Sequence, residues 1–204
     1  MPARSNRDAA IVDGKLSRLH EPHVAPITEL VEQLRKERAT DSVPYVDPTL
    51  GGVRARVLFL LETPARAAAL KSQMLSPDND DPTAENLWKF YEESGLPRAR
   101  AVHWNAVPWF MGTVDKNKGA SIEDLKEGLI WLGRFRELLP ELRLVVTMGG
   151  IAQRAFALHL LQPESRLLPW LAVAHPSDRV LRTNPELRGG IQMAFAKAAQ
   201  SVGE

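Results

Sequence analysis

The fold is decided by one short stretch of sequence, Val57-Leu58-Phe59-Leu60-Leu61-Glu62-Thr63-Pro64-Ala65. Its first half is a continuous apolar run, which is typical of a strand buried on both faces of a parallel sheet. Pro64 stands where the first turn of a helix would begin, and the strong helix formers after it favour its continuation. A buried strand that passes at once into a helix predicts an α/β fold, with Glu62 at the end of the strand.

Three further apolar runs have the character of buried strands, at Ala101–Asn105, Leu144–Met148 and residues 171–174. Helical patterns separate them, so strand and helix alternate along the chain. Such alternation predicts a parallel sheet with helices on both faces, joined by right-handed crossovers. We therefore expect a three-layer αβα sandwich with a central four-stranded parallel sheet.

The helices are expected from apolar periodicity and from the residues that start or stop them. Ser121 and Asp124 form a capping-box pattern, and Gly95 is placed to end a helix that Thr83 begins. Pro185 marks the start of the last helix. The expected helices cover residues 27–38, 64–74, 84–94, 122–139, 151–161 and 185–200.

Size and composition bound the organisation of the chain. At 204 residues with 44% hydrophobic content, it is long enough for one good core. Residues 1–22 lack apolar periodicity, and we expect a flexible N-terminal extension there, followed by a single α/β domain over residues 23–204. Within that domain, residues 43–52 carry prolines and a Gly-Gly pair and are expected to form a linker or a turn.

Several classes of protein are excluded or disfavoured by composition. The absence of cysteine excludes disulfides, thiolate nucleophiles and metal sites held by cysteine, and no histidine spacing indicates a metal, so we expect neither metal nor cofactor. No apolar run is long enough to span a membrane, and residues 1–15 lack the apolar core of a secretory signal. These features favour a cytoplasmic protein, which we expect to be a monomer. The net charge of +1 does not by itself indicate a nucleic-acid binder.

Polar or flexible residues follow each predicted strand at its carboxyl end. They are Glu62, Asn105, the pair Gly149-Gly150, and His175. Ligands of open α/β sheets bind outside the carboxyl ends of the strands, because the crossovers bring these ends to one edge. We therefore expect Glu62, Asn105 and His175 to line one cleft although they are far apart in the sequence.

The residues at these strand ends also form an ordered set of short motifs. They are Leu61-Glu62-Thr63-Pro64-Ala65, then His103-Trp104-Asn105-Ala106-Val107-Pro108-Trp109, and finally His175-Pro176-Ser177. In order and spacing this set resembles the uracil-DNA glycosylase superfamily, and the resemblance covers roughly residues 53–200. It implies a uracil-DNA glycosylase-like α/β fold and a protein that acts on single- or double-stranded DNA without a cofactor.

The resemblance implies a role for individual residues. Glu62 would position the attacking water, Asn105 would read the uracil edge, and His175 would stabilise the charge that develops on uracil O2. The implied substrate pocket includes Pro64, Trp109, Phe110 and Ser177. Contacts with DNA phosphates are expected from Arg179, Arg182 and Arg188, which follow the histidine motif.

The chain departs from the family's pattern at several positions. Leu61 and Ala65 stand where the first motif has glycines, whose lack of a side chain lets the backbone approach the base. The aromatic residue that would stack on uracil is absent. Met74 and Leu75 are near its place, and Trp109 or Phe110 are the available aromatic replacements. The cluster-binding cysteines of the thermophilic branch are also missing, which indicates a divergent branch.

Three functions are compatible with these observations. The first is a base-excision glycosylase that hydrolyses the N-glycosidic bond of uracil or a related damaged base in DNA. The second is a catalytically inactive nucleic-acid-binding or interaction module that keeps the fold. The third is an enzyme that acts on a free nucleotide or another small nucleobase compound. The retained strand-end groups favour the first, and the lost glycines favour the second.

Each residue singled out also has an ordinary structural interpretation. Glu62 fits a carboxylate near a helix N-terminus, and Asn105 fits an asparagine that closes a turn. His175 fits a loop histidine with a local partner. His103 and His159 are interpreted as structural or surface histidines.

Overall fold

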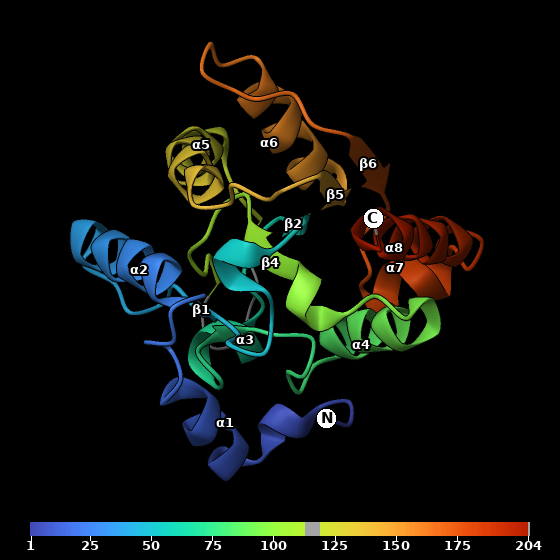
Figure 1. The fold of residues 1–204 in the computed structure, drawn as a ribbon, viewed down its shortest axis with the longest axis horizontal. Coiled ribbons are helices and arrows are strands. Elements are labelled where there is room, and N and C mark those ends of the chain that lie inside the picture. The colour runs from blue at the N-terminus through green and yellow to red at the C-terminus, as the bar shows by residue number, and fades with distance from the viewer. Residues whose placement is uncertain (113–118, 204) are drawn as a thin grey trace.

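A four-stranded parallel sheet forms the centre of the computed structural model, which describes residues 1–112 and 119–203. Its strand order is β4-β2-β5-β6 (Figure 1). The strands are β2 (Val57–Leu61), β4 (Ala101–Asn105), β5 (Leu144–Met148) and β6 (Trp170–Val173). All three neighbouring pairs are parallel, which confirms the predicted sheet.

Helices cover both faces of this sheet and complete the predicted three layers (Figure 1). One face packs against α2 (Ala25–Arg38), α5 (Ile122–Glu137) and α6 (Gly150–Leu160), and the other against α4 (Pro82–Ser94) and α8 (Leu187–Val202). Alternate side chains of β2 point to opposite faces, because the side chains of a strand have a period of two. Leu58 accordingly lies in the first cluster and Phe59 in the second.

Shorter elements complete the fold. A separate two-stranded parallel sheet pairs β1 (Tyr45–Val46) with β3 (Met74–Leu75). The remaining elements are η1 (Ser5–Arg7), α1 (Ala9–Leu16), η2 (Gly52–Arg54), α3 (Arg66–Leu70), η3 (Arg98–Arg100) and α7 (Asp178–Thr183). Within the described residues, no helix is both long and apolar enough to cross a membrane.

The N-terminal residues differ from the expected flexible extension. They form η1 and α1, and Lys15 of α1 is buried with its ammonium group 2.6 Å from Asp47 and 2.8 Å from Asp78. Arg4 forms an ion pair with Glu85 of α4 at 2.7 Å. Val12 and Leu19 of this segment reach the core, but its other buried contacts are polar, and apolar periodicity gives no sign of those.

Several element boundaries also differ from expectation. The expected linker at residues 43–52 is largely buried and includes β1, because it pairs with β3 rather than running over the surface. Asp81, not Thr83, caps α4 by accepting a hydrogen bond from the Ala84 backbone N–H at 3.0 Å. The last expected helix is preceded by the separate helix α7 and begins at Leu187. The capping box of α5 is present as predicted.

Candidate active site

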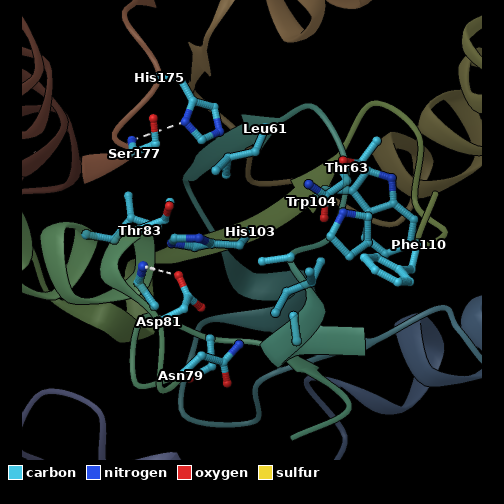
Figure 2. Close-up of a pocket in the computed structure, with 18 of the residues that line it drawn as sticks. Leu61, Thr63, Asn79, Asp81, Thr83, His103, Trp104, Phe110, His175 and Ser177 are labelled. Carbon is cyan, nitrogen blue, oxygen red and sulfur yellow. Dashed lines mark hydrogen bonds between the residues drawn. The ribbon is translucent and has the colours of Figure 1, made fainter. Parts of the chain in front are cut away.

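A cavity of about 250 Å³ opens at the carboxyl edge of the sheet. Its walls come from the segments after β2, β4 and β6, together with β3 and the start of α4 (Figure 2). Asn105 and His175 both line it, and so do Pro64, Phe110 and Ser177. The parallel sheet therefore brings most of the expected pocket residues to one place, although they are spread over more than half of the chain.

Asn105 ends β4 and is almost completely buried, with 3% of its surface exposed. Its side-chain oxygen Oδ1 is buried and accepts no hydrogen bond from the described residues. A buried acceptor without a partner costs about 1–3 kcal/mol. Asn105 therefore lines the cavity with an amide whose oxygen no described residue engages.

His175 follows β6 and turns its ring into the upper part of the cavity in Figure 2. The backbone N–H of Ser177 donates a hydrogen bond to its Nδ1 at 3.1 Å. Burial lowers the pKa of His175, and the nearby charge of Glu62 raises it in part. A neutral imidazole whose Nδ1 accepts a hydrogen bond carries its proton on Nε2, so His175 is a donor through Nε2.

Glu62 follows β2, but it is not among the residues that line the cavity. Its carboxylate accepts a hydrogen bond from the backbone N–H of Ala120 at 3.3 Å, just before the N-terminus of α5. This resembles the structural interpretation of a carboxylate near a helix start. Its effect on the pKa of His175 nevertheless places its charge within electrostatic reach of the cavity.

The two expected aromatic residues lie in different environments. Phe110 lines the cavity, close to Thr63 and Trp104 in Figure 2. Trp109 is buried outside the cavity lining, with the guanidinium group of Arg38 3.6 Å from its ring centre. Trp109 therefore cannot stack on a ligand in this cavity, whereas Phe110 is in position to contact one.

The three arginines expected at DNA differ in how firmly they are held. Arg188 forms an ion pair with Glu93 at 2.6 Å and lies over the ring of Phe90, so it ties α8 to α4. Arg182 forms an exposed ion pair with Asp178 at 2.8 Å. Arg179 is exposed, and no ion-pair partner is found for it within the described residues. Arg179 is the most available of the three.

Sequence reasoning missed several polar residues of the cavity, chiefly His103, Asn79 and Asp81. His103 is buried in β4, and its Nε2 lies 2.8 Å from the hydroxyl of Tyr91. Burial raises the pKa of the Asp81 carboxyl, which also caps α4. The two-residue period of β4 puts His103 on the same face as Asn105, and this was the one signal in the sequence.

The described residues contain no group of three or more histidine, cysteine or carboxylate side chains that could hold a metal ion. The polar side chains that line the cavity carry amide, imidazole, hydroxyl and carboxyl groups. These groups suit hydrogen bonding to a polar heterocycle.

Comparison with known proteins agrees with this architecture. The sequence model of the uracil DNA glycosylase superfamily matches residues 48–194. The crystal structure of wild-type SMUG2 from Pedobacter heparinus superposes with a TM-score of 0.55 at 12% identity, covering 90% of this chain and 86% of that one. A solution structure from Methanosarcina acetivorans, provisionally named a uracil DNA glycosylase, gives a TM-score of 0.47 at 14% identity, covering 71% and 91%.

No curated protein matches the sequence. The likeness to SMUG2 shows a shared fold, since its identity is too low to carry activity with it. The family match is independent of that likeness and spans most of the chain, including all three motifs at the strand ends. This chain belongs to the uracil DNA glycosylase superfamily.

Proposed function

We propose that the protein is a DNA glycosylase, which hydrolyses the N-glycosidic bond of uracil or a related damaged base. The observation that carries the proposal is the buried, unpartnered Oδ1 of Asn105 in the cavity. Family membership supports DNA as the partner, and the cavity of about 250 Å³ suits a single flipped base rather than a larger cofactor.

Asn105 supplies the pattern that a uracil edge requires. Uracil presents N3–H as a donor and O4 as an acceptor, and one carboxamide offers an acceptor and a donor side by side. Oδ1 would accept from N3–H, and the amide nitrogen would donate to O4. The free energy that the unpartnered Oδ1 costs in the empty cavity would be recovered when uracil binds.

His175 would act on the opposite side of the base. Its Nε2–H, fixed by the hydrogen bond that Nδ1 accepts from Ser177, would donate to uracil O2. When the N1–C1′ bond breaks, its electron pair goes to the base, and negative charge develops on N1 and O2. A positioned neutral donor stabilises this charge more strongly in a cavity with little water.

Glu62 would act at the sugar of the flipped nucleotide rather than at its base. A water molecule adds its oxygen to C1′ as the bond to N1 breaks, and it passes a proton to the carboxylate of Glu62. The products are an abasic site and the free base, which takes up a proton from solvent. Because Glu62 lies outside the cavity lining, it would approach the sugar at the mouth of the cavity and not the base within it.

The departures from the family's motifs support a second candidate, an inactive module that binds nucleic acid. Leu61 and Leu75 line the cavity where the family has a glycine and a stacking aromatic residue, and the Glu62 carboxylate already has a backbone partner. Aliphatic side chains give a base less stacking energy than an aromatic ring. Phe110 is the aromatic side chain at the cavity that would compensate.

The deciding experiment is incubation of the full chain with end-labelled DNA that contains one uracil, followed by alkali cleavage at abasic sites. A panel of other damaged bases, in single- and double-stranded DNA, establishes base and strand preference. Cleavage that is lost in His175→Ala and strongly reduced in Glu62→Ala supports the glycosylase. DNA binding without cleavage of any substrate would instead establish the inactive module.

A further inference from the structure

Tyr91 of α4 and His103 of β4 form a buried pair beside the cavity. The Tyr91 hydroxyl lies 2.8 Å from Nε2 of His103, and the two rings stack with centroids 5.8 Å apart. Tyr91 has 2% and His103 3% of its surface exposed. His103 also lines the cavity, between His175 and Asp81 in Figure 2.

The hydroxyl of Tyr91 fixes the tautomer of His103. Nε2 is the hydrogen-bond partner that the described residues offer this hydroxyl, and burial raises the pKa of Tyr91, so the hydroxyl keeps its proton. If His103 donated through Nε2, the proton of Tyr91 would be buried without an acceptor, at a cost of about 1–3 kcal/mol. Tyr91 therefore donates to Nε2, and His103 carries its own proton on Nδ1.

The imidazole of His103 stays neutral over the whole pH range of an assay. Burial, with the charge of Arg98 next in effect, lowers its pKa to about 3. Nδ1–H has no hydrogen-bond partner among the described residues. The ring is thus held as a fixed donor at the cavity wall, with one nitrogen occupied by Tyr91 and the other available to a ligand.

The position of His103 relative to Asn105 indicates which part of a bound base its Nδ1–H would contact. His103 and Asn105 are two residues apart on β4, so their side chains leave the same face of the strand, about 7 Å apart along it. Both line the cavity. A base that turned its O2 toward His175 and its N3–H toward Asn105 would present its O4 to the part of the cavity wall that contains His103.

We infer that His103 is a further specificity-determining residue, which donates Nδ1–H to the oxygen at position 4 of the base. The inference rests on the proposed function and deepens it. O4 of uracil has two lone pairs, so it can accept from the Asn105 amide and from His103 together. The amino group at position 4 of cytosine would meet a second donor there and leave Nδ1–H unpaired, so Tyr91 and His103 together favour a 4-keto pyrimidine.

The test compares uracil with 4-thiouracil in DNA, because sulfur at position 4 is a weak acceptor and N3–H is kept. The variant is the double replacement His103→Phe and Tyr91→Phe, which keeps both rings against Phe59 and leaves no orphaned hydroxyl. The control is His159→Phe, which removes a buried histidine that does not line this cavity.

The measured quantity is the ratio of kcat/KM for uracil to kcat/KM for 4-thiouracil. We expect the double variant to lower this ratio about tenfold, or ~1.4 kcal/mol, and the control to leave it unchanged. A merely structural role would lower both rates together and keep the ratio, which would overturn the inference while the proposed function stands. A wild-type protein without activity on any base would overturn the proposed function, and the inference with it.

A second measurement tests the tautomer of His103 directly and does not depend on catalytic activity. In protein with ¹⁵N-labelled histidine, long-range proton–nitrogen NMR spectra identify which ring nitrogen carries the proton. We expect Nδ1–H for His103 and Nε2–H for His175, with the His103 signals assigned from the double variant. A proton on Nε2 of His103 would overturn the inference whatever the activity.

Discussion

Gly149 leaves no room for a side chain beside His175: a Cβ atom on Gly149 would lie 3.2 Å from Cβ of His175. Gly149 follows β5 with a φ of 93°, a conformation that favours glycine, and its N–H donates to Val173 at 2.9 Å. The turn between β5 and α6 thus forms part of the support for the proposed catalytic imidazole.

Replacing Gly149 with alanine should therefore impair both stability and activity. A φ of 93° with a ψ of 157° lies in a region that is essentially restricted to glycine and costs another residue about 1–3 kcal/mol, and the close contact would also displace His175. Chemical denaturation measures the first effect, and single-turnover cleavage of uracil DNA measures the second. Gly150→Ala is the matched control, because a Cβ there has nothing within 4 Å, and we expect no loss of stability from it.

The second prediction concerns the buried ammonium group of Lys15. Replacing Lys15 with methionine leaves Asp47 and Asp78 buried with one less cation, and we expect a loss of about 3–5 kcal/mol at neutral pH. Equilibrium unfolding in urea measures it. Lys197→Met, which changes an exposed lysine of α8, serves as control and should stay within about 0.5 kcal/mol of wild type.

The effect of Lys15→Met should also depend on pH. Burial alone would raise the pKa of Asp47, but the charge and hydrogen bond of Lys15, together with hydrogen bonds from Ser76 and Thr49, more than offset this and lower it. A lowered pKa contributes stability above the unfolded value near 4, and this contribution is lost as pH falls through the folded value. The difference between wild type and variant should therefore be largest above about pH 5 and narrow in acid. A difference that widened in acid would contradict the assignment.

The third prediction tests the coupling between Glu62 and His175. Burial lowers the pKa of His175, and the charge of Glu62 raises it in part, so Glu62→Gln should lower it further. An NMR titration of the His175 ring measures the shift. Glu123→Gln removes an equivalent charge from an exposed position of α5 and should leave the His175 titration unchanged. An unchanged titration in Glu62→Gln would show that the two side chains do not interact.

The sheet could be predicted because its strands carry their own signal. Residues such as Leu58 and Val145 lie in continuous apolar runs. Each run can be recognised as a strand from its own residues, without information about residues far away in the sequence. Helix α1 gave no such signal, since its buried positions are Val12 and Lys15. Burial of Lys15 depends on Asp47, which is 32 residues away, and apolar periodicity contains no information about that pairing.

The same reasoning explains what was and was not predicted at the cavity. Asn105 is the last residue of β4 and His175 comes two residues after β6, so the rule about the carboxyl ends of strands predicted that both would line the cavity. His103 lies within β4, and its role depends on Tyr91, which belongs to α4 and meets it only in the folded chain. Trp109 is the immediate neighbour of Phe110 in the sequence, and only its burial under Arg38, a tertiary contact, keeps it out of the cavity lining.

The fourth prediction concerns contacts with DNA. Of the three arginines that follow the histidine motif, Arg179 is the exposed one for which no ion-pair partner is found among the described residues, so Arg179→Ala should weaken binding to DNA of any sequence. Loss of one phosphate contact should reduce the slope of log K against log salt by about one. Arg182→Ala is the comparison, and it should have a smaller effect because Asp178 already neutralises that side chain. Equal effects would contradict this ranking.

The last prediction concerns how Asn105 distinguishes uracil from cytosine. Replacing it with aspartate keeps the shape of the side chain but removes the donor that would meet uracil O4. An ionised carboxylate accepts from the amino group of cytosine and cannot donate to O4. We expect excision of uracil to fall about 10- to 100-fold, as the loss of one or two buried hydrogen bonds implies, and the preference for uracil over cytosine to narrow.

Three measurements make this prediction decisive. Excision from matched strands with uracil or cytosine at one position gives the preference, and binding to uncleaved DNA shows whether the variant still engages the substrate. Asn184→Asp makes the same chemical change outside the cavity, and it should alter neither the preference for uracil nor the binding to uncleaved DNA. If Asn105→Asp lowered all activity while the preference for uracil stayed constant, then Asn105 would hold the cavity in shape without reading the base. Its buried, unpartnered Oδ1 would then need a different ligand to account for it.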